Sequence, residues 1–271
     1  MVEKKVRLDL LLVQKGLVKS REKAKALIMA GKVFQGNIRL DKPGMMIEEN
    51  AEITVKGDPC PFVSRGGLKL AKALAVFPID LQGKVVADIG ASTGGFTDCA
   101  LQNGAKKVYA IDVGYGQLDW KLRTDSRVEC LERTNARFLK EDSLPQKVDF
   151  VVCDVSFISL TKIFPAIAAI LKDEGQMIIL IKPQFEAGRE QVGKNGVVKD
   201  PLIHEMVLNK VLAEAEEYHF LVRGLDYSPI RGPEGNIEFL AWLQKSTIQK
   251  RDFDWLTAVP LLVRQAQTET E

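Results

Sequence analysis

The chain of 271 residues has few residues suited to binding metals or to forming disulfides. It contains two histidines, His204 and His219, and four cysteines, none of which forms a CxxC pair. Zinc sites and disulfide frameworks need denser or more regular spacing of such residues. We therefore expect reduced thiols, no metal site and no catalysis by histidine.

Long apolar runs are also absent. No stretch approaches the ~18–20 apolar residues of a spanning helix, and no apolar signal-peptide core follows the charged residues at positions 3–7. These absences predict a cytoplasmic protein with no membrane partner.

Charge of one sign is concentrated at the N-terminus. Residues 1–42 carry 11 lysines and arginines against 4 acidic residues, whereas the rest of the chain sums to −5. This asymmetry indicates a basic module joined to a near-neutral body, although solvated surface lysines would give the same count.

A small-residue loop at 88–97 lies between an apolar strand pattern at 84–87 and a helical pattern at 98–103. A second strand pattern, 107–111, ends at Asp112, which is placed to accept hydrogen bonds from ribose hydroxyls. Glycines in such a loop let a ligand approach the backbone. The loop therefore predicts a nucleoside-cofactor site, with these candidates: Asp88, Gly90, Ala91, Ser92, Gly94, Gly95, Phe96, Thr97 and Asp112.

The glycine spacing separates the possible cofactors. A dinucleotide site favours GxGxxG, whereas this loop is GxxxGG. It resembles the S-adenosylmethionine loop of FtsJ-like methyltransferases, and that resemblance implies S-adenosylmethionine as cofactor. A dinucleotide site and a plain tight turn are the alternatives.

Strand and helix patterns alternate through the rest of the chain. Strands are expected at 128–131, 148–153, 176–181, 221–227 and 237–243, and helices at 68–76, 160–171 and 201–218. Such alternation predicts an α/β fold with a mainly parallel, Rossmann-like sheet covered on both faces. The polar tail at 265–271 is expected to fray.

The basic N-terminal segment predicts a short helix at 6–16, a second helix after the N-cap Ser20, and strands at 33–34, 38–40 and 53–55. It resembles the small α+β S4 RNA-binding domain. No aromatic residues are interleaved with the basic ones, which favours recognition of RNA shape over stacking on single strands. The RNA-binding candidates are Arg7, Lys19, Arg21, Lys23, Lys25, Lys32 and, beyond the domain, Arg65.

The turn-rich stretch 56–61 marks the domain boundary. We expect an S4-like RNA-binding domain at 1–57, a linker at 58–63 and a methyltransferase domain at 64–271.

Four charged residues match a catalytic motif in the family's order. Lys69, Asp154, Lys182 and Glu238 correspond to the Lys-Asp-Lys-Glu tetrad of FtsJ-like ribose 2′-O-methyltransferases. The surrounding words VSRGGLK, DVSFISL and KPQFE resemble the TlyA branch, which joins an S4 domain to an FtsJ-like domain. That resemblance implies methylation of a cytidine ribose in ribosomal RNA or ribosomal subunits, without a metal.

The residue types suit this chemistry. A ribose hydroxyl must lose its proton as the methyl group is attacked, and we assign Lys182 as the base, oriented by Asp154 and Glu238. Asn135 and Arg137 are candidates for contact with the adenine or for a loop role, and His204 is expected on a helix surface. Two rival hypotheses are a membrane-active hemolysin, a label that members of this family often carry, and a catalytically idle RNA-binding protein.

Overall fold

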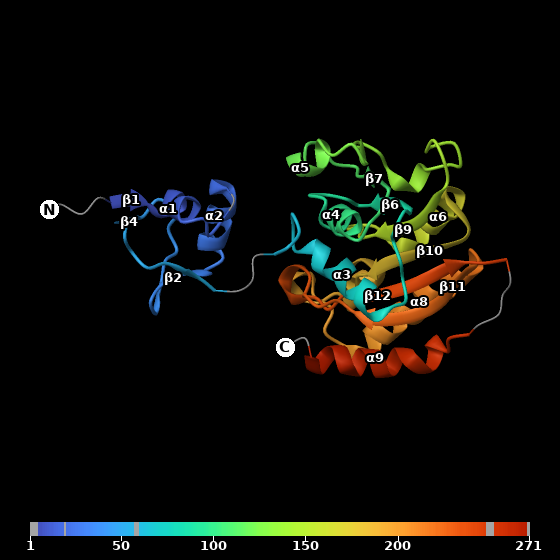
Figure 1. Ribbon diagram of the computed structural model, residues 1–271. Coiled ribbons are helices and arrows are strands. Elements are labelled where there is room, and N and C mark those ends of the chain that lie inside the picture. The colour runs from blue at the N-terminus through green and yellow to red at the C-terminus, as the bar shows by residue number, and fades with distance from the viewer. Residues whose placement is uncertain (1–4, 19, 57–59, 248–251, 270–271) are drawn as a thin grey trace. The chain divides into compact units, whose positions relative to one another are not determined.

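The computed structural model describes residues 5–18, 20–56, 60–247 and 252–269. It divides into two compact units, Met1–Pro61 and Phe62–Glu271, each with its own hydrophobic core (Figure 1). The boundary falls within the linker expected at 58–63, of which residues 58 and 59 lie outside the described part of the chain.

Within residues 5–18 and 20–56, the N-terminal unit contains two helices and five short strands. They are β1 Lys5–Arg7, α1 Leu8–Gln14, α2 Arg21–Met29, β2 Val33–Gln35, β3 Ile38–Arg39, β4 Met46–Glu48 and β5 Thr54–Val55. Strand β1 pairs with β4, and β2 lies between β3 and β5. Ser20 caps α2 as expected, because its hydroxyl accepts a hydrogen bond from the Lys23 amide. The helix expected at 6–16 begins only at Leu8, because the preceding residues pair with β4, a strand that the sequence analysis missed.

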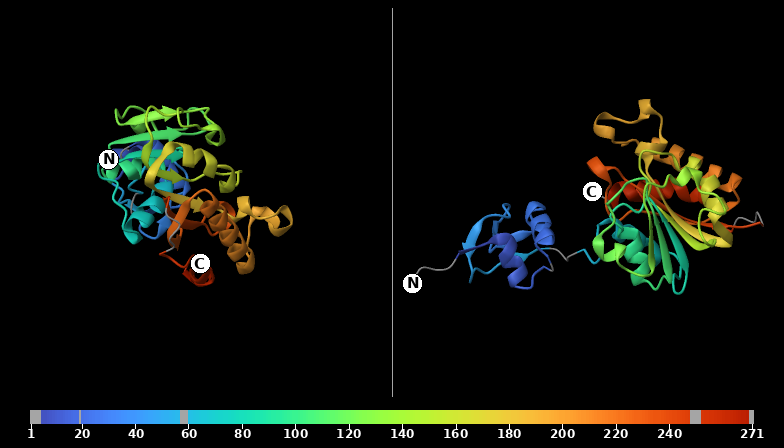
Figure 2. Two further views of the ribbon diagram at one scale, coloured as in Figure 1. Left: turned by 90° about the vertical axis from the view of Figure 1, so that its right-hand side faces the viewer. Right: turned by 90° about the horizontal axis from the view of Figure 1, so that it is seen from above.

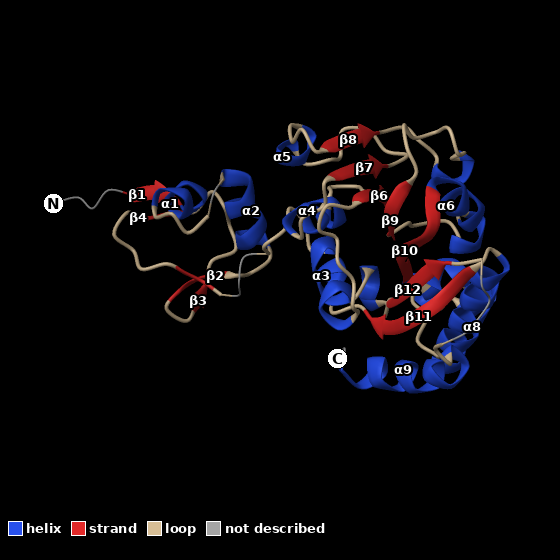
Figure 3. Ribbon diagram, turned by 45° about the vertical axis from the view of Figure 1, so that its right-hand side comes forward, coloured by secondary structure: helices blue, strands red, loops and turns tan. Residues whose placement is uncertain are grey.

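A seven-stranded sheet organises the second unit, in the order β11-β12-β10-β9-β6-β7-β8 (Figure 3). The strands are β6 Val85–Ile89, β7 Lys107–Ile111, β8 Val128–Leu131, β9 Val148–Cys153, β10 Leu171–Ile181, β11 Phe220–Tyr227 and β12 Phe239–Lys245. The five strands from β10 to β8 are parallel, whereas β12 runs antiparallel to both of its neighbours. This confirms the Rossmann-like α/β prediction.

Helices cover both faces of this sheet (Figure 2). The longer ones are α3 Gly66–Val76, α4 Gly95–Gln102, α6 Phe164–Ile170, α8 Pro201–Glu217 and α9 Trp255–Glu269, and the short ones are α5 Trp120–Arg123 and α7 Pro183–Glu186. Helices α6, α8 and α9 share one core with the sheet. On the other face, Thr97 of α4 bonds to Asp88 of β6. No helix among the described residues is both long and apolar enough to cross a bilayer.

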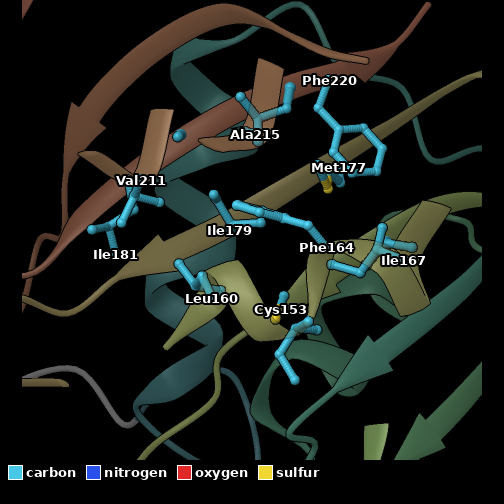
Figure 4. Close-up of a cluster of buried hydrophobic side chains, with 14 of the residues drawn as sticks. Cys153, Leu160, Phe164, Ile167, Met177, Ile179, Ile181, Val211, Ala215 and Phe220 are labelled. Atoms are coloured by element: carbon cyan, nitrogen blue, oxygen red, sulfur yellow. The ribbon is translucent and has the colours of Figure 1, made fainter. Parts of the chain in front are cut away.

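The main core lies between β9, β10 and the helices α6 and α8 (Figure 4). Ile179, Phe164 and Phe220 are fully buried there. At about 1.5–3 kcal/mol for each fully buried large apolar side chain, this layer is the main stabilising contribution to the unit. It fixes the strand ends from which the functional side chains project.

Two expectations for this unit were wrong. The helix expected at 160–171 breaks into the 3-10 helix η2 Leu160–Lys162 and α6, and Leu171 already begins β10. The tail expected to fray is helical to Glu269, because Val259, Leu262, Val263 and Ala266 form a buried stripe against the core.

Candidate active site

The loop between β6 and α4 is held on its buried side by the carboxyl group of Asp88. Asp88 is fully buried and accepts a hydrogen bond from Thr97 Oγ1 at 2.6 Å. Burial raises the pKa of Asp88 to about 7, against the hydrogen bond from Thr97. Both residues stabilise the loop from inside and do not line the two cavities beside it.

Gly90 and Gly94 are needed for packing within the protein. Both have left-handed backbones, with φ of +85° and +92°. A Cβ at Gly90 would lie 2.6 Å from the Asp154 carbonyl oxygen, and one at Gly94 would lie 2.2 Å from Leu122 Cδ1. A side chain at either position would therefore meet the protein itself, a different reason from the ligand approach that we expected.

Asp112, at the end of β7, ties two loops together. Its carboxylate accepts hydrogen bonds from the amides of Ser92 at 2.8 Å and Gly114 at 2.7 Å. Each oxygen keeps a further lone pair, so the carboxylate is able to accept from a ligand as well.

The larger of the two cavities has a volume of about 420 Å³ and lies over the carboxyl ends of β6, β7 and β9. Asp112 and Asn135 supply polar atoms to its wall, and Ile111, Ile158 and Ile163 supply apolar surface. A nucleoside needs a hydrogen-bond acceptor for its ribose hydroxyls and an apolar slot for its base, and this cavity offers both. Of the two candidates for adenine contact, Asn135 lines this cavity, whereas the exposed Arg137 does not.

A smaller cavity, of about 200 Å³, adjoins the first. Gly90, Ser92, Asp154 and Ser156 line both cavities, and Lys182 lines only the smaller one. Ala91, Gly95 and Phe96 of the loop also face this smaller space, together with Ser64. The two cavities thus lie side by side and share the Asp154 segment as a wall.

The four tetrad residues come together at one edge of the sheet. Asp154 and Lys182 follow β9 and β10, and Lys69 lies in the first turn of α3. Glu238 lies one residue before β12. Because β12 runs antiparallel, its first residue is at the same edge as the last residues of its parallel neighbours.

Their charges alternate along a chain of contacts. Lys69 Nζ lies 2.7 Å from Glu238 Oε2 and 3.3 Å from Asp154 Oδ2. Lys182 Nζ lies 2.5 Å from the other oxygen, Asp154 Oδ1, and donates to Ser156 Oγ at 2.9 Å. The order is therefore Glu238, Lys69, Asp154, Lys182, with Lys182 at the cavity end.

This set of charges is almost closed to water. The side chains of Lys69 and Lys182 are 10% and 8% exposed, and that of Glu238 is fully buried. Removing one partner would leave a buried charge uncompensated, which costs about 3–5 kcal/mol. Two anions and two cations balance each other, so the group as a whole is neutral.

Two further side chains near the tetrad were not found by sequence reasoning. Ser156 accepts a hydrogen bond from Lys182, and Glu186 bonds to the segment that follows Asp154. His204, expected on a helix surface, is buried: its ring contacts the Val198 carbonyl oxygen and Gln267 of α9. Burial lowers the pKa of His204.

In the N-terminal unit, two RNA-binding candidates share one carboxylate. The Asp9 side chain is fully buried at the start of α1, and its oxygens lie 3.1 Å from Arg7 Nε and 2.9 Å from an Arg21 nitrogen. The hydrogen bond from Arg7 is the main cause that lowers the pKa of Asp9 to about 2. Both arginine side chains remain 45% exposed.

The other basic candidates are dispersed. Lys25 and Lys32 are exposed, and Lys23 Nζ bonds to the Cys60 carbonyl oxygen at 3.3 Å. Arg65 is exposed at the start of α3, in the second unit, and Lys19 lies outside the described residues.

Comparison with known proteins agrees with this architecture. The FtsJ-like methyltransferase family model matches residues 62–245, and the S4 domain model matches residues 6–53. The chain belongs to the TlyA family, since a relative of that name is 44% identical over 90% of it. This confirms the resemblance inferred from the sequence words.

Relatives in the TlyA family match over most of the chain. The "Putative rRNA methyltransferase YqxC" of Bacillus subtilis is 53% identical over 90% of this chain and 87% of its own length. The "16S/23S rRNA (cytidine-2′-O)-methyltransferase TlyA" of Mycobacterium tuberculosis is 44% identical over 90% of this chain and 91% of its own. The solved structure of a "putative hemolysin" from Streptococcus thermophilus is 50% identical, with a TM-score of 0.79 over 99% of this chain and 98% of that one.

Proposed function

We propose that this protein transfers the methyl group of S-adenosylmethionine to the 2′-hydroxyl of a cytidine ribose in ribosomal RNA. The observation that carries the proposal is the buried chain of alternating charges that ends with Lys182 at the cavity. The name of the Mycobacterium tuberculosis relative, a 16S/23S rRNA (cytidine-2′-O)-methyltransferase 44% identical over 90% of this chain, supports the choice of substrate.

The cavities suit this cofactor and a ribose beside it. Asp112 and the apolar wall of the larger cavity would hold the nucleoside part, and the segment from Gly90 to Phe96 would face the rest. When bound, S-adenosylmethionine supplies an activated methyl group on a sulfonium centre. Its binding is independently testable, and we expect Asp112→Ala to weaken it about tenfold or more.

In this proposal Lys182 reacts as the neutral amine, after its ammonium form has released a proton to solvent, and it takes the proton from the 2′-hydroxyl as the oxygen attacks. Asp154 and Ser156 hold the Lys182 side chain in place and stabilise the ammonium group that forms. Lys69 lies between Asp154 and Glu238 and balances their charges, so that Asp154 is held in one position. Alignment of the hydroxyl with the methyl group supplies much of the remaining rate.

The decisive experiment is methyl transfer from labelled cofactor to ribosomal subunits taken from cells that lack the gene, followed by mapping of the modified nucleotide. Calorimetry with S-adenosylmethionine runs beside it. Cofactor binding without transfer would favour the idle RNA-binding protein. Leakage of dye from vesicles, with no cofactor binding, would favour the membrane-active hemolysin.

A further inference from the structure

Glu186 connects the two segments that carry the pair Lys182 and Asp154. It is the last residue of α7, the single turn that follows Lys182, and is 6% exposed. Its Oε2 accepts a hydrogen bond from Ser159 Oγ at 2.6 Å, and its Oε1 accepts one from the Leu160 amide at 2.7 Å. Ser159 and Leu160 end the turn that begins at Asp154.

That turn needs support from outside. Phe157, in its middle, has φ of +64°, a conformation that a non-glycine residue adopts at a cost of about 1–3 kcal/mol. At its first residue the Asp154 amide donates to the Ile89 carbonyl oxygen at 3.0 Å. At its far end the turn is held by Glu186 and by the burial of Leu160 in the core (Figure 4).

The hydrogen bonds to Glu186 stabilise its carboxylate in a buried environment that disfavours negative charge. Burial raises the pKa of Glu186, and the bonds from Ser159 and Leu160 oppose that effect. Among the described residues no ion pair to Glu186 is found within 4 Å; the Lys210 ammonium bonds to its main-chain oxygen at 3.5 Å and acts on the carboxylate through its charge alone. The carboxylate therefore serves its two donors, both of which belong to the Asp154 turn.

We propose that Glu186 is a positioning residue, which fixes the turn 154–160 against α7 so that Asp154 Oδ1 and Ser156 Oγ stay on the Lys182 ammonium group. It acts through other residues and touches no substrate. The kinetic part of this inference rests on the proposed function, and the structural part does not.

Two substitutions at this position separate geometry from charge. Glu186→Gln keeps both bonds, because its carbonyl oxygen accepts from the Leu160 amide and its amide donates to the Ser159 hydroxyl, whose own proton is then donated to Thr161 Oγ1, 2.9 Å away. Glu186→Ala loses both. We expect Glu186→Ala to lower the single-turnover rate at saturating cofactor and RNA about 100-fold, as misplacement of a catalytic group does. Glu186→Gln should stay within about threefold of wild type, with affinities for cofactor and RNA unchanged. Measurement at saturating cofactor separates the rate loss of Glu186→Ala from weaker cofactor binding at Ile158, the residue of this turn that lines the larger cavity.

Asp149→Ala is the matched control. Asp149 accepts a hydrogen bond from the Val85 amide at 2.8 Å and pairs with Lys172 at 2.7 Å, near the opposite end of the strand that leads to Asp154. Its removal should lower stability and leave the single-turnover rate unchanged. Equal rate losses in Glu186→Ala and Asp149→Ala, at equal folded fraction, would overturn the positioning role. So would an equal loss in Glu186→Gln, which would assign the effect to charge.

Hydrogen exchange at the Leu160 amide gives a readout that does not need activity. Glu186→Ala should speed that exchange at least about tenfold, with no change at the Val86 amide in the sheet. If Glu186→Ala fails to fold, Ser159→Ala is the substitute variant, because it removes only one of the two hydrogen bonds. It should lower the single-turnover rate about tenfold. If the Leu160 amide exchanges at the same rate in Glu186→Ala as in the wild type, the inference is wrong. If exchange is faster in the variant but the wild type transfers no methyl group, only the proposed function is refuted.

Discussion

Each unit of this protein contains a carboxylate held between two cations, and the exposure of the cations differs. In the N-terminal unit Asp9 is buried, and Arg7 and Arg21 are 45% exposed. In the second unit Asp154 lies between Lys69 and Lys182, which are 10% and 8% exposed. In the first arrangement the positive charges are exposed to water and would be accessible to a phosphate group. In the second arrangement they are buried.

The choice of cation fits this difference. Guanidinium keeps its proton in proteins and offers several fixed donors, whereas an ammonium group is able to lose a proton in a suitable environment. Arginine at the exposed pair therefore suits binding, and lysine at the buried pair suits proton transfer. If the proposed function is correct, the same local arrangement would serve RNA binding in one unit and proton transfer in the other, according to depth and residue type.

The largest expected effect is at Lys182. Lys182→Ala and Lys182→Arg should each lower the single-turnover methylation rate about 10³-fold, because neither side chain accepts the proton. The apolar strand before it is unchanged, so the fold and cofactor affinity should persist. Lys182→Ala should still lower the free energy of unfolding by about 3–5 kcal/mol, because it leaves a buried negative charge without its partner. Substantial activity in the Arg variant would show that positive charge alone is sufficient, and the contrast between the two pairs would fail.

Asp88 extends the comparison to a buried carboxylate that forms no ion pair with any described residue. Its pKa is raised from 3.8 to about 7, so the folded state holds its proton where the unfolded state has lost it. Its contribution to stability is therefore full below about pH 4 and falls as pH rises towards 7. Asp88→Asn should remove about 2–3 kcal/mol of the difference between the free energies of unfolding at pH 5 and pH 8.

Urea unfolding at the two pH values measures this effect. Asp88→Asn keeps an oxygen that accepts the hydrogen bond from Thr97 and removes only the ionisable group. Thr97→Val is the complementary variant, because it removes the hydrogen bond without changing the charge. An equal pH dependence in wild type and Asp88→Asn would contradict the assigned ionisation.

Substitution of Asp9 should have a smaller effect, on RNA affinity. The sign of the change distinguishes an acidic residue that merely repels RNA from one that holds the arginines in place. Removing an acidic charge from a surface that binds RNA should strengthen binding, as we expect for the exposed Glu22→Gln on α2. If Asp9 instead holds Arg7 and Arg21 in place, Asp9→Asn should weaken binding to ribosomal subunits about tenfold. Titrations at several salt concentrations measure both variants.

A background lacking the arginines tests this assignment. In Arg7→Gln/Arg21→Gln, Asp9→Asn should have no further effect on RNA affinity. A persistent loss there would indicate that Asp9 supports the fold of the unit in general.

The smallest effect concerns the exposed pair itself. Arg7→Lys/Arg21→Lys keeps both charges and should keep RNA affinity within about threefold, with the salt slope preserved. Binding as weak as in the glutamine pair would mean that guanidinium geometry, and not charge, determines the contact. Lysine would then be unsuitable at the exposed pair just as we expect arginine to be at the buried one.

The sheet and the loop at 88–97 were accessible from sequence because each depends on local pattern, whereas the tetrad was assigned through the resemblance to FtsJ-like methyltransferases. The helix α9 also has such a pattern in Val259, Leu262, Val263 and Ala266, and its polar neighbours and Pro260 obscured it. Ser156 and Glu186 could not be found in this way. Their hydrogen bonds join residues 26 and 27 positions apart in sequence, through a turn whose geometry no spacing rule gives.

The antiparallel strand β12 has a consequence for how the site forms. Glu238 reaches Lys69 only after the chain between them has been completed, and Lys69 and Asp154 are themselves 85 residues apart. Contacts so distant along the chain form late, since loop closure precedes any reward from pairing. Recovery of enzymatic activity on refolding should therefore lag behind recovery of helical circular dichroism, and a ribosome-bound chain ending before residue 238 should have an incomplete site.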